Sequence, residues 1–226
     1  MACANLLPQQ PNRCPVCASP SAAGARPNSP CVRCSQHPPA FHRTYAGVAY
    51  EAPFDRLLHA LKFQGHLAGA PFFARAILNR LIADNDSEHG ATIQALQTTA
   101  ALVPIPLSQQ GLARRGFNQA YVLAKALHQY ASSRGIALPP IQSNWLVRQQ
   151  DLPPQSSLNR QARLQNLRHA FNVPAIHQPL LFGQSIILID DVMTSGMTLH
   201  FAAKALQAAG ALHIYGLVAA RTALQA

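Results

Sequence analysis

Four consecutive apolar residues, Ile186–Ile189, run directly into two adjacent aspartates, and this segment constrains the fold more than any other part of the chain. A strand with one face in water alternates apolar and polar residues, whereas a strand without polar positions is apolar on both faces. Strands covered on both faces are typical of parallel sheets with helices on either side. The segment therefore predicts an α/β fold in which 186–189 is a buried strand of a parallel sheet.

Short apolar runs alternate with helical patterns along most of the chain, as expected for such a fold. The expected strands are 44–50, 101–106, 141–147, 186–189 and 213–218. The expected helices are 53–65, 71–82, 118–130 and 198–209. Residues 84–90 and 149–157 are rich in polar or loop-forming residues and are predicted loops.

The composition indicates one main core with an appendage. The chain has 226 residues, of which 49% are hydrophobic and 12% charged, and this composition excludes collagen, coiled coils and charge-driven disorder. Two large domains would each fall short of a sufficient core at this length. We expect an N-terminal segment of residues 1–40 and a main domain of residues 41–226. Within that domain, 41–90 would form a helical cover and 98–226 the α/β core.

The N-terminal segment contains all 5 cysteines and little apolar periodicity, so its side chains alone cannot build a core. Two Cys-x-x-Cys pairs, Cys14 with Cys17 and Cys31 with Cys34, are close to the spacing of four-cysteine zinc sites. Each pair directs two thiolates at one point, and together they complete a tetrahedron around Zn²⁺. A zinc ribbon or knuckle is the prediction. The alternatives are a disulfide framework and inert thiols, and the absence of a recognisable export signal favours zinc over disulfides.

The residues after the buried strand predict a sugar-phosphate site. Ligands of open parallel sheets bind beyond the carboxyl ends of the strands, where Asp190 and Asp191 lie. Two carboxylates can accept hydrogen bonds from the hydroxyls of a ribose. Amides and hydroxyls of 194–198 can bind a phosphate at the start of the next helix, and Gly196 permits close approach. The alternative is a buried strand followed by an ordinary polar turn.

This segment resembles a known signature. An apolar tetrad, Asp-Asp, two apolar residues and Thr-Ser-Gly-Met-Thr resemble the phosphoribosyl pyrophosphate (PRPP) motif of type I phosphoribosyltransferases. Further segments resemble the ComF family in the same order: the two Cys-x-x-Cys pairs, 61–63, 103–107, 115–119, 155–163 and 166–171. ComF and GntX proteins are phosphoribosyltransferase-like, and the ComF name comes from natural competence, in which imported single-stranded DNA is handled. The resemblance implies a type I phosphoribosyltransferase-like parallel sheet flanked by helices, with an N-terminal four-cysteine zinc-binding segment.

The resemblance also implies roles for individual residues. Asp190 and Asp191 would hold the ribose of PRPP, and its 5′-phosphate would bind Thr194, Ser195, Gly196, Met197 and Thr198. Arg114 and Arg115 follow a turn that resembles the pyrophosphate loop, although a solvated basic turn is an equally good description. Lys62 and Phe63 match a Lys-aromatic pair of the family whose role is unassigned.

Residues 149–168 resemble a flexible loop that closes over the substrate, and its contacts would be Arg160, Arg163 and Arg168. A surface helix with ordinary arginines is the alternative. If the protein is an enzyme, Asp190, Asp191 and Arg163 form its catalytic group, and Mg²⁺ neutralises the departing pyrophosphate. One departure matters. Purine-salvage relatives have an aspartate where this chain has Thr194, so the loop lacks a base that could activate an acceptor.

The charge indicates anionic partners. The 18 Lys and Arg residues against 8 Asp and Glu residues give a net charge of +10. Arginine, which predominates, suits phosphates. Solubility alone is the alternative explanation. Two function classes follow: an enzyme or PRPP-binding protein, and an accessory module that binds single-stranded DNA or a partner such as a competence helicase or DNA-processing protein. No membrane span is expected, and the predicted location is the cytoplasm.

Overall fold

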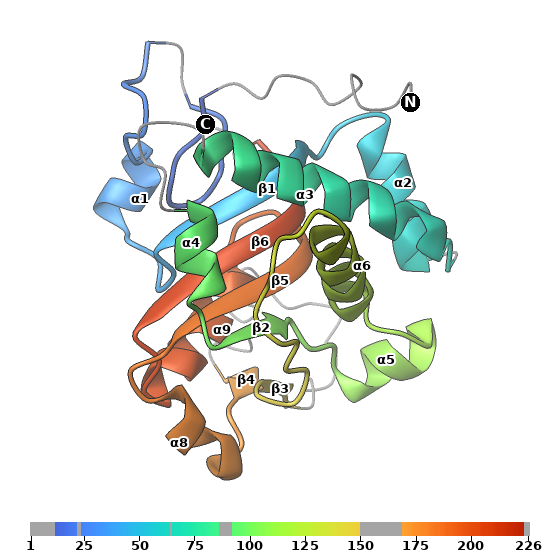
Figure 1. Cartoon of the computed structure of the whole chain (residues 1–226), viewed down its shortest axis with the longest axis vertical. Coiled ribbons are helices and arrows are strands. Elements are labelled where there is room, and N and C mark those ends of the chain that lie inside the picture. The colour runs from blue at the N-terminus through green and yellow to red at the C-terminus, as the bar shows by residue number, and fades with distance from the viewer. Residues whose placement is uncertain (1–11, 22–23, 64, 86–91, 150–168, 224–226) are drawn as a thin grey trace, which may run out of the picture.

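A four-stranded parallel sheet forms the centre of the molecule (Figure 1). The computed structural model describes residues 12–21, 24–63, 65–85, 92–149 and 169–223. The sheet order is β1-β6-β5-β2, and each neighbouring pair of strands is parallel. These strands are β1 (Arg43–Ala49), β2 (Ala101–Pro104), β5 (Ser185–Met193) and β6 (His213–Arg221).

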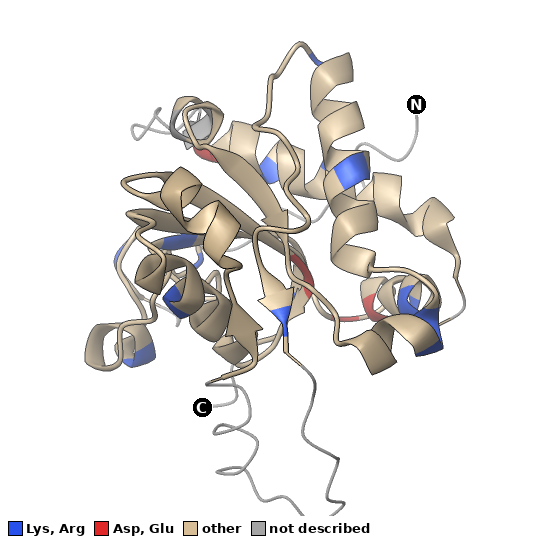
Figure 2. Ribbon diagram, turned by 90° about the horizontal axis from the view of Figure 1, so that it is seen from below, with Lys and Arg blue, Asp and Glu red and all other residues tan. Residues whose placement is uncertain are grey.

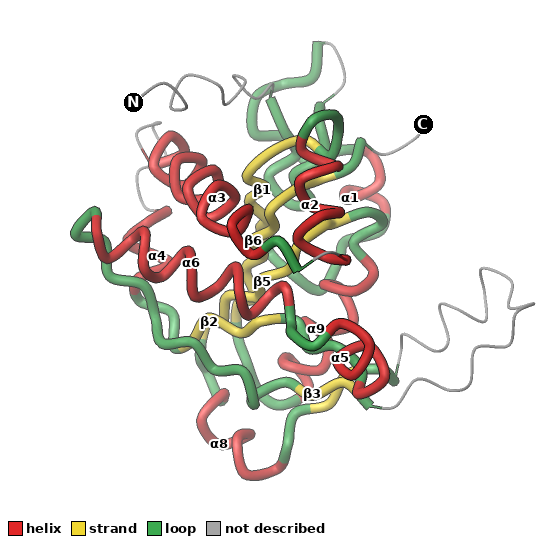
Figure 3. Tube along the Cα trace, turned by 90° about the vertical axis from the view of Figure 1, so that its right-hand side faces the viewer, coloured by secondary structure: helices red, strands yellow, loops and turns green. Residues whose placement is uncertain are grey.

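Helices cover both faces of this sheet (Figures 1 and 3). One face packs against α2 (Phe54–Phe63), α3 (Ala70–Asn85) and α6 (Gln119–Ser133), and the other packs against α9 (Met197–Ala208). The predicted parallel sheet flanked by helices is therefore confirmed. Among the helices of the described residues, none combines the length and apolarity needed to cross a membrane.

Shorter elements complete the fold. They are α1 (Val32–Gln36), α4 (Thr92–Gln97), α5 (Gln109–Arg115), α8 (Gln178–Leu181), the antiparallel pair β3 (Val147–Arg148) and β4 (Phe171–Asn172), and the 3₁₀ turns Leu67–Gly69 and Ala175–His177. Local capping explains how α5 leads into α6. Gly116 ends α5 in the left-handed region at a φ of 77°. Asn118 then begins α6, where its Oδ1 accepts hydrogen bonds from the backbone N–H groups of Ala120 and Tyr121.

Strand β5 shows why its apolar run specifies the sheet. Ile186 and Leu188 belong to the core on the α9 side, whereas Ile187 and Ile189 belong to the core on the α3 and α6 side. Successive side chains of a strand point to opposite faces, so a strand covered on both faces needs an apolar residue at every position. The strand is longer than predicted, because it continues through both aspartates to Met193.

Two sequence expectations differ from the structure. The strand expected at 141–147 is reduced to β3 and an isolated parallel bridge between Ile141 and Leu102. The loop expected at 84–90 begins later, because α3 continues to Asn85 and Asp84 accepts a hydrogen bond from Arg43 at 2.9 Å. The remainder of that loop lies outside the described residues. The strand expected at 44–50 is present as β1, at an edge of the sheet.

The described part of residues 1–40, called the cysteine segment below, packs onto the main domain. Cys14, Cys17 and Cys34 are buried and belong to the same core as α9. Beside the outer edge of β1, the backbone N–H of Thr44 donates a hydrogen bond to the carbonyl of Pro15 at 3.3 Å. The segment therefore covers part of this strand edge. The domain boundary at residue 40 stays a prediction.

Candidate functional site

The carboxylates at the end of β5 are held by the backbone that follows them. Asp190 Oδ1 accepts a hydrogen bond from the N–H of Asp191 at 2.8 Å, and Asp191 Oδ1 accepts one from the N–H of Val192 at 2.7 Å. Asp191 is buried, with 7% of its surface exposed, and Asp190 is partly buried. These bonds fix one oxygen of each carboxylate. The second oxygen of Asp190 is not engaged by this backbone, whereas Asp191 Oδ2 contacts a lysine.

Lys62 of α2 supplies a cation to this pair. Its Nζ lies 2.9 Å from Asp191 Oδ2, and 27% of its side chain is exposed. Lys62 stands in the last turn of α2, and its carbonyl accepts a hydrogen bond from Gln119 Nε2 at 3.4 Å. The sequence resemblance marked Lys62 without a role. The structure identifies it as the charge partner of a candidate site residue.

Asp190 titrates far from its usual range. Desolvation, followed by the negative charge of Asp191, raises the pKa of Asp190 to about 8, although Lys62 opposes the shift. At neutral pH this carboxyl therefore keeps its proton. A divalent cation or a second basic group beside the pair would favour its ionised form. Binding of such a cation would then be coupled to release of a proton.

The predicted phosphate loop, residues 194–198, leads into the start of a helix. Thr194 and Ser195 are exposed, and α9 begins at Met197, so backbone N–H groups of the first turn lack partners within the helix. Gly196 has a φ of 79°, a conformation that residues with a side chain rarely adopt. A Cβ atom at this position would lie 2.6 Å from Met193 Cε. The loop therefore depends on glycine here and presents amides and hydroxyls beside the carboxylates.

The structure separates the two arginines of the predicted pyrophosphate turn. Arg114 is exposed, whereas Arg115 is half-buried against α2 and α6. The Nη1 atom of Arg115 donates a hydrogen bond to Gln119 Oε1 at 3.0 Å, and its guanidinium lies 5.4 Å from the ring centre of Phe63. Since Gln119 also contacts the Lys62 carbonyl, Arg115 is connected through one residue to the partner of Asp191.

The predicted closing loop contains three of the candidate substrate contacts. Arg160, Arg163 and Arg168 lie outside the described residues. Their contacts with substrate, including the catalytic role expected for Arg163, therefore stay predictions.

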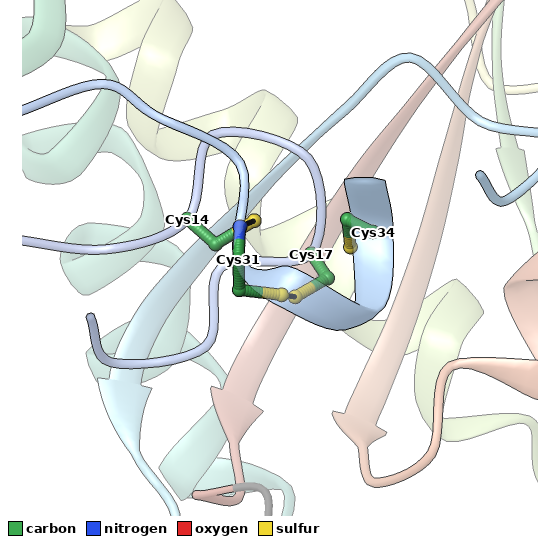
Figure 4. Close-up of side chains that lie close together, drawn as sticks. All are labelled: Cys14, Cys17, Cys31 and Cys34. Atoms are coloured by element: carbon green, nitrogen blue, oxygen red, sulfur yellow. Dashed lines mark hydrogen bonds between the residues drawn. The ribbon is translucent and has the colours of Figure 1, made fainter. Parts of the chain in front are cut away.

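The four cysteines predicted as metal ligands come together (Figure 4). One sulfur atom from each of Cys14, Cys17, Cys31 and Cys34 lies within 4.8 Å of the others. The sulfur atoms of Cys17 and Cys31 are 3.8 Å apart, and the N–H of Cys31 points to the sulfur of Cys14 at 3.3 Å. A zinc tetrahedron with bonds of about 2.3 Å has edges of about 3.8 Å. The cluster could therefore hold a metal such as zinc.

The close packing of the cluster shifts the pKa values of its thiols in opposite directions. A hydrogen bond from Cys17 lowers the pKa of Cys14 to about 4, and burial raises the pKa of Cys34 to about 12. The surrounding charges suit a tetrathiolate metal centre, which carries a net negative charge. Arg13 and Arg221 are both buried beside the cluster, and neither forms an ion pair with a carboxylate of the described residues. The donor set and its charge environment fit zinc.

Arg221 joins the cysteine segment to the phosphate loop. Its Nε donates a hydrogen bond to the carbonyl of Cys17 at 2.8 Å. Its Nη1 donates to the carbonyl of Met193 at 3.0 Å and to that of Thr194. The residue is 1% exposed. No pattern in the sequence indicated this link, because a single arginine at the end of an apolar strand has no signature.

Comparison with known proteins finds relatives that match most of the chain. The chain is 31% identical over 209 residues to DNA utilization protein YhgH of Salmonella typhimurium, a match that covers 92% of this chain and 84% of that protein. It is 29% identical over 192 residues to competence protein F of Haemophilus influenzae, covering 84% of this chain and 78% of that protein. No protein-family model matches the chain.

Among solved structures, a likeness is found to a glutamine PRPP amidotransferase from B. subtilis. The sequence identity is 14% and the TM-score is 0.32, over 56% of this chain and 24% of that one. A score of this size supports no statement about fold or function, so the α/β class rests on the sheet order and the helices described above.

Proposed function

The chain belongs to the ComF family, and on that premise we propose that it binds PRPP at the carboxyl end of β5 and acts in DNA uptake or DNA metabolism. The observation that carries the proposal is the continuity of β5, the adjacent Asp190 and Asp191, and a glycine-dependent loop that leads into α9. A ribose 5-phosphate ester needs acceptors for its diol and donors for its phosphate. This segment supplies both within nine residues, 190–198.

Mg²⁺ would accompany PRPP in this proposal. Carboxylate oxygens are the ligands that Mg²⁺ prefers, and the carboxylates of Asp190 and Asp191 could bind it directly or through water. When bound, Mg²⁺ would neutralise charge on the pyrophosphate group. Arg115, held by Gln119 and Phe63, would add a fixed positive charge at the same end of the sheet.

Binding of PRPP does not require that the protein transfer its phosphoribosyl group. Displacement of pyrophosphate would need a group that activates the acceptor, and no carboxylate follows Asp191 in the chain. We therefore propose binding of PRPP as the primary property. Product analysis after incubation with PRPP, Mg²⁺ and a panel of nucleobases would detect transferase activity, which appears as a nucleoside monophosphate together with pyrophosphate.

A second candidate function is an accessory role in binding single-stranded DNA or a DNA-processing partner. The net charge of +10 favours it, and Figure 2 shows Lys and Arg on several helices of the described residues. Two relatives are named DNA utilization protein and competence protein. This role requires that affinity for single-stranded DNA fall steeply between about 50 and 200 mM salt. An affinity that does not change with salt would exclude binding through phosphates.

Calorimetric titration with PRPP in the presence of Mg²⁺ tests the main proposal. We expect saturable binding by the wild type and its loss in the double variant Asp190→Asn, Asp191→Asn. Asp55→Asn is a matched control, because Asp55 is an acidic residue in the first turn of α2, outside the site. Equal binding by the double variant and the control would show that the carboxylate pair is not the binding site.

A further inference from the structure

Lys62 holds the place where a cation would bind Asp191. Its Nζ lies 2.9 Å from Asp191 Oδ2, while Asp191 Oδ1 accepts a hydrogen bond from the N–H of Val192 at 2.7 Å. Oδ2 is therefore the oxygen that Asp191 offers to a cation. An ammonium group and a divalent cation on this one oxygen would repel each other strongly, because their charges would lie only a few ångströms apart. Lys62 and a metal ion thus compete for Oδ2.

The backbone of Lys62 is anchored, whereas its ammonium group can move. The Lys62 carbonyl accepts a hydrogen bond from Gln119 Nε2 at 3.4 Å, and Gln119 is buried. The Lys62 side chain is 27% exposed, and within the described part of the chain its one ion pair is with Asp191. A lysine side chain is a flexible stem that carries a compact charge. Its Nζ can therefore change partner while the end of α2 stays in place.

The anchor of Lys62 also holds the arginine proposed for the pyrophosphate. Gln119 Oε1 accepts a hydrogen bond from Arg115 Nη1 at 3.0 Å, and the Arg115 guanidinium lies 5.4 Å from the ring centre of Phe63, the residue after Lys62. Arg115 forms no ion pair with a carboxylate of the described residues, and its buried Nε has no hydrogen-bond partner among them. The same corner of the site therefore carries two cations, of which only Lys62 is paired with an acid.

Two hydrogen bonds attach this corner to the strand end that carries the carboxylates. The N–H of Ile105 donates to the carbonyl of Ile189 at 2.9 Å, and Ile189 directly precedes Asp190. The carbonyl of Ile105 accepts from Asn118 Nδ2 at 3.0 Å, and Asn118 begins α6 one position before Gln119. The groups that hold Lys62 and Arg115 are thus fixed relative to the carboxylate pair.

We propose that Lys62 exchanges partners when the site fills, an inference that rests on the proposed PRPP site. Without a ligand, Lys62 occupies Asp191 Oδ2 and weakens the binding of a free divalent cation. When PRPP binds together with its divalent cation, Lys62 leaves Asp191 and its ammonium group binds the pyrophosphate beside Arg115. The pyrophosphate offers several anionic oxygens, whereas a carboxylate that binds a divalent cation attracts an ammonium group much less. The site thereby favours the cation that arrives with PRPP over the free cation.

Two affinities of the zinc-loaded full chain test this exchange. The first is the affinity for Mn²⁺ without PRPP, measured from the electron paramagnetic resonance signal of the free ion, since Mn²⁺ takes the same oxygen ligands as Mg²⁺. Lys62→Met removes the competing charge and should bind Mn²⁺ at least about tenfold more tightly than the wild type. The second is the affinity for PRPP with Mg²⁺, measured by calorimetry. The same variant should bind PRPP at least about tenfold more weakly, because the pyrophosphate loses a charged hydrogen bond.

Two further variants complete the test. Lys125→Met, on the exposed face of α6, is the matched control and should leave both affinities unchanged. Lys62→Arg keeps a cation beside Asp191, so it should bind Mn²⁺ no more tightly than the wild type, and it tests the competition even if Lys62→Met does not fold.

The opposite signs of the two changes separate this exchange from a purely structural role of Lys62. Unchanged Mn²⁺ affinity in Lys62→Met, or tighter Mn²⁺ binding by Lys62→Arg, would overturn the competition at Asp191. Unchanged or tighter PRPP binding by Lys62→Met would overturn the transfer to the pyrophosphate, since Lys62 would then only block the site. A wild type that binds no PRPP would refute the proposed function instead, whereas the competition is decided by Mn²⁺ alone.

Discussion

Lys62 Nζ and Asp191 Oδ2 are 2.9 Å apart, which connects the last turn of α2 to the carboxyl end of β5. The pair brings together two segments 129 positions apart in the chain. Asp191 is buried and paired with the Lys62 ammonium, while Asp190 beside it has a pKa raised to about 8. The ligand-free site therefore carries less negative charge than two adjacent aspartates would suggest.

Replacing Lys62 by Met should destabilise the fold. Removing one partner leaves a buried carboxylate without a counter-charge, and we expect the free energy of unfolding to fall by about 2 kcal/mol at pH 7. Denaturant unfolding measures this loss. Lys125→Met on the exposed face of α6 is the control and should change stability by less than about 0.5 kcal/mol.

A double-mutant cycle identifies the partner of Lys62. If the ion pair is responsible, the double variant Lys62→Met, Asp191→Asn should lose less free energy of unfolding than the two single variants lose together. We expect the difference to be at least about 1 kcal/mol. Additive losses would mean that Lys62 stabilises the protein through its packing alone.

Asp190→Asn should stabilise the protein at alkaline pH. The folded pKa of Asp190 is about 8 and the reference value is 3.8, so the folded chain holds a proton that the unfolded chain has lost. Stability contributed by this group is therefore present at low pH and is lost as pH rises from about 4 to about 8. At pH 8 we expect Asn to raise the free energy of unfolding by about 1 kcal/mol or more, which is about 2–4 °C in Tm.

The pH profile provides the control for this prediction. Near pH 4 the folded wild type is protonated at Asp190 and the unfolded chain is about half protonated, so the difference between wild type and Asp190→Asn should be much smaller there than at pH 8. A stabilisation that is equal at pH 4 and pH 8 would contradict the raised pKa.

Gly196→Ala tests the backbone of the phosphate loop. The left-handed conformation costs a residue with a side chain about 1–2 kcal/mol, and the new Cβ would also displace the end of Met193. Gly183→Ala is a matched control, because Gly183 has a φ of 71° and no atom within 4 Å of the added Cβ. Both variants should lose stability in thermal unfolding, but only Gly196→Ala should lose PRPP affinity. Equal PRPP affinity in the two would remove the loop from the site.

Much of the fold could be predicted because the apolar pattern is local. The run 186–189 indicates that its strand is buried on both faces. Asn118 marks the start of α6 because its side chain accepts backbone hydrogen bonds, and Gly116 marks the end of α5 because it has no side chain. The short strand β3 could not be predicted, because only two residues pair and the pairing depends on β4, 23 positions later.

Part of the candidate site could also be predicted from the sequence. Adjacent carboxylates and paired cysteines carry their chemistry in the sequence, so Asp190, Asp191 and the cysteine cluster were expected. The contributions of Lys62 and Arg221 depend on long-range packing. Each is a single basic residue at the end of an element, and only the fold brings it to the acceptors that give it a role.

Removal of the cysteine cluster should release the metal and speed hydrogen exchange in the phosphate loop, residues 194–198. We expect about one equivalent of zinc per chain in the wild type and its loss in Cys14→Ser, Cys17→Ser, whereas Cys3→Ser should retain it. Because Arg221 bridges Cys17 to Met193 and Thr194, hydrogen exchange of the loop amides should also accelerate in the metal-free variant. Metal loss without faster exchange would mean that the two segments are independent.

A crystal structure of the protein with PRPP and Mg²⁺ tests the central claim most directly. The account predicts the ribose hydroxyls against Asp190 and Asp191 and the 5′-phosphate against the amides of 195–198 at the start of α9. PRPP bound at any other place, or carboxylates that keep only Lys62 as their partner in the complex, would contradict it.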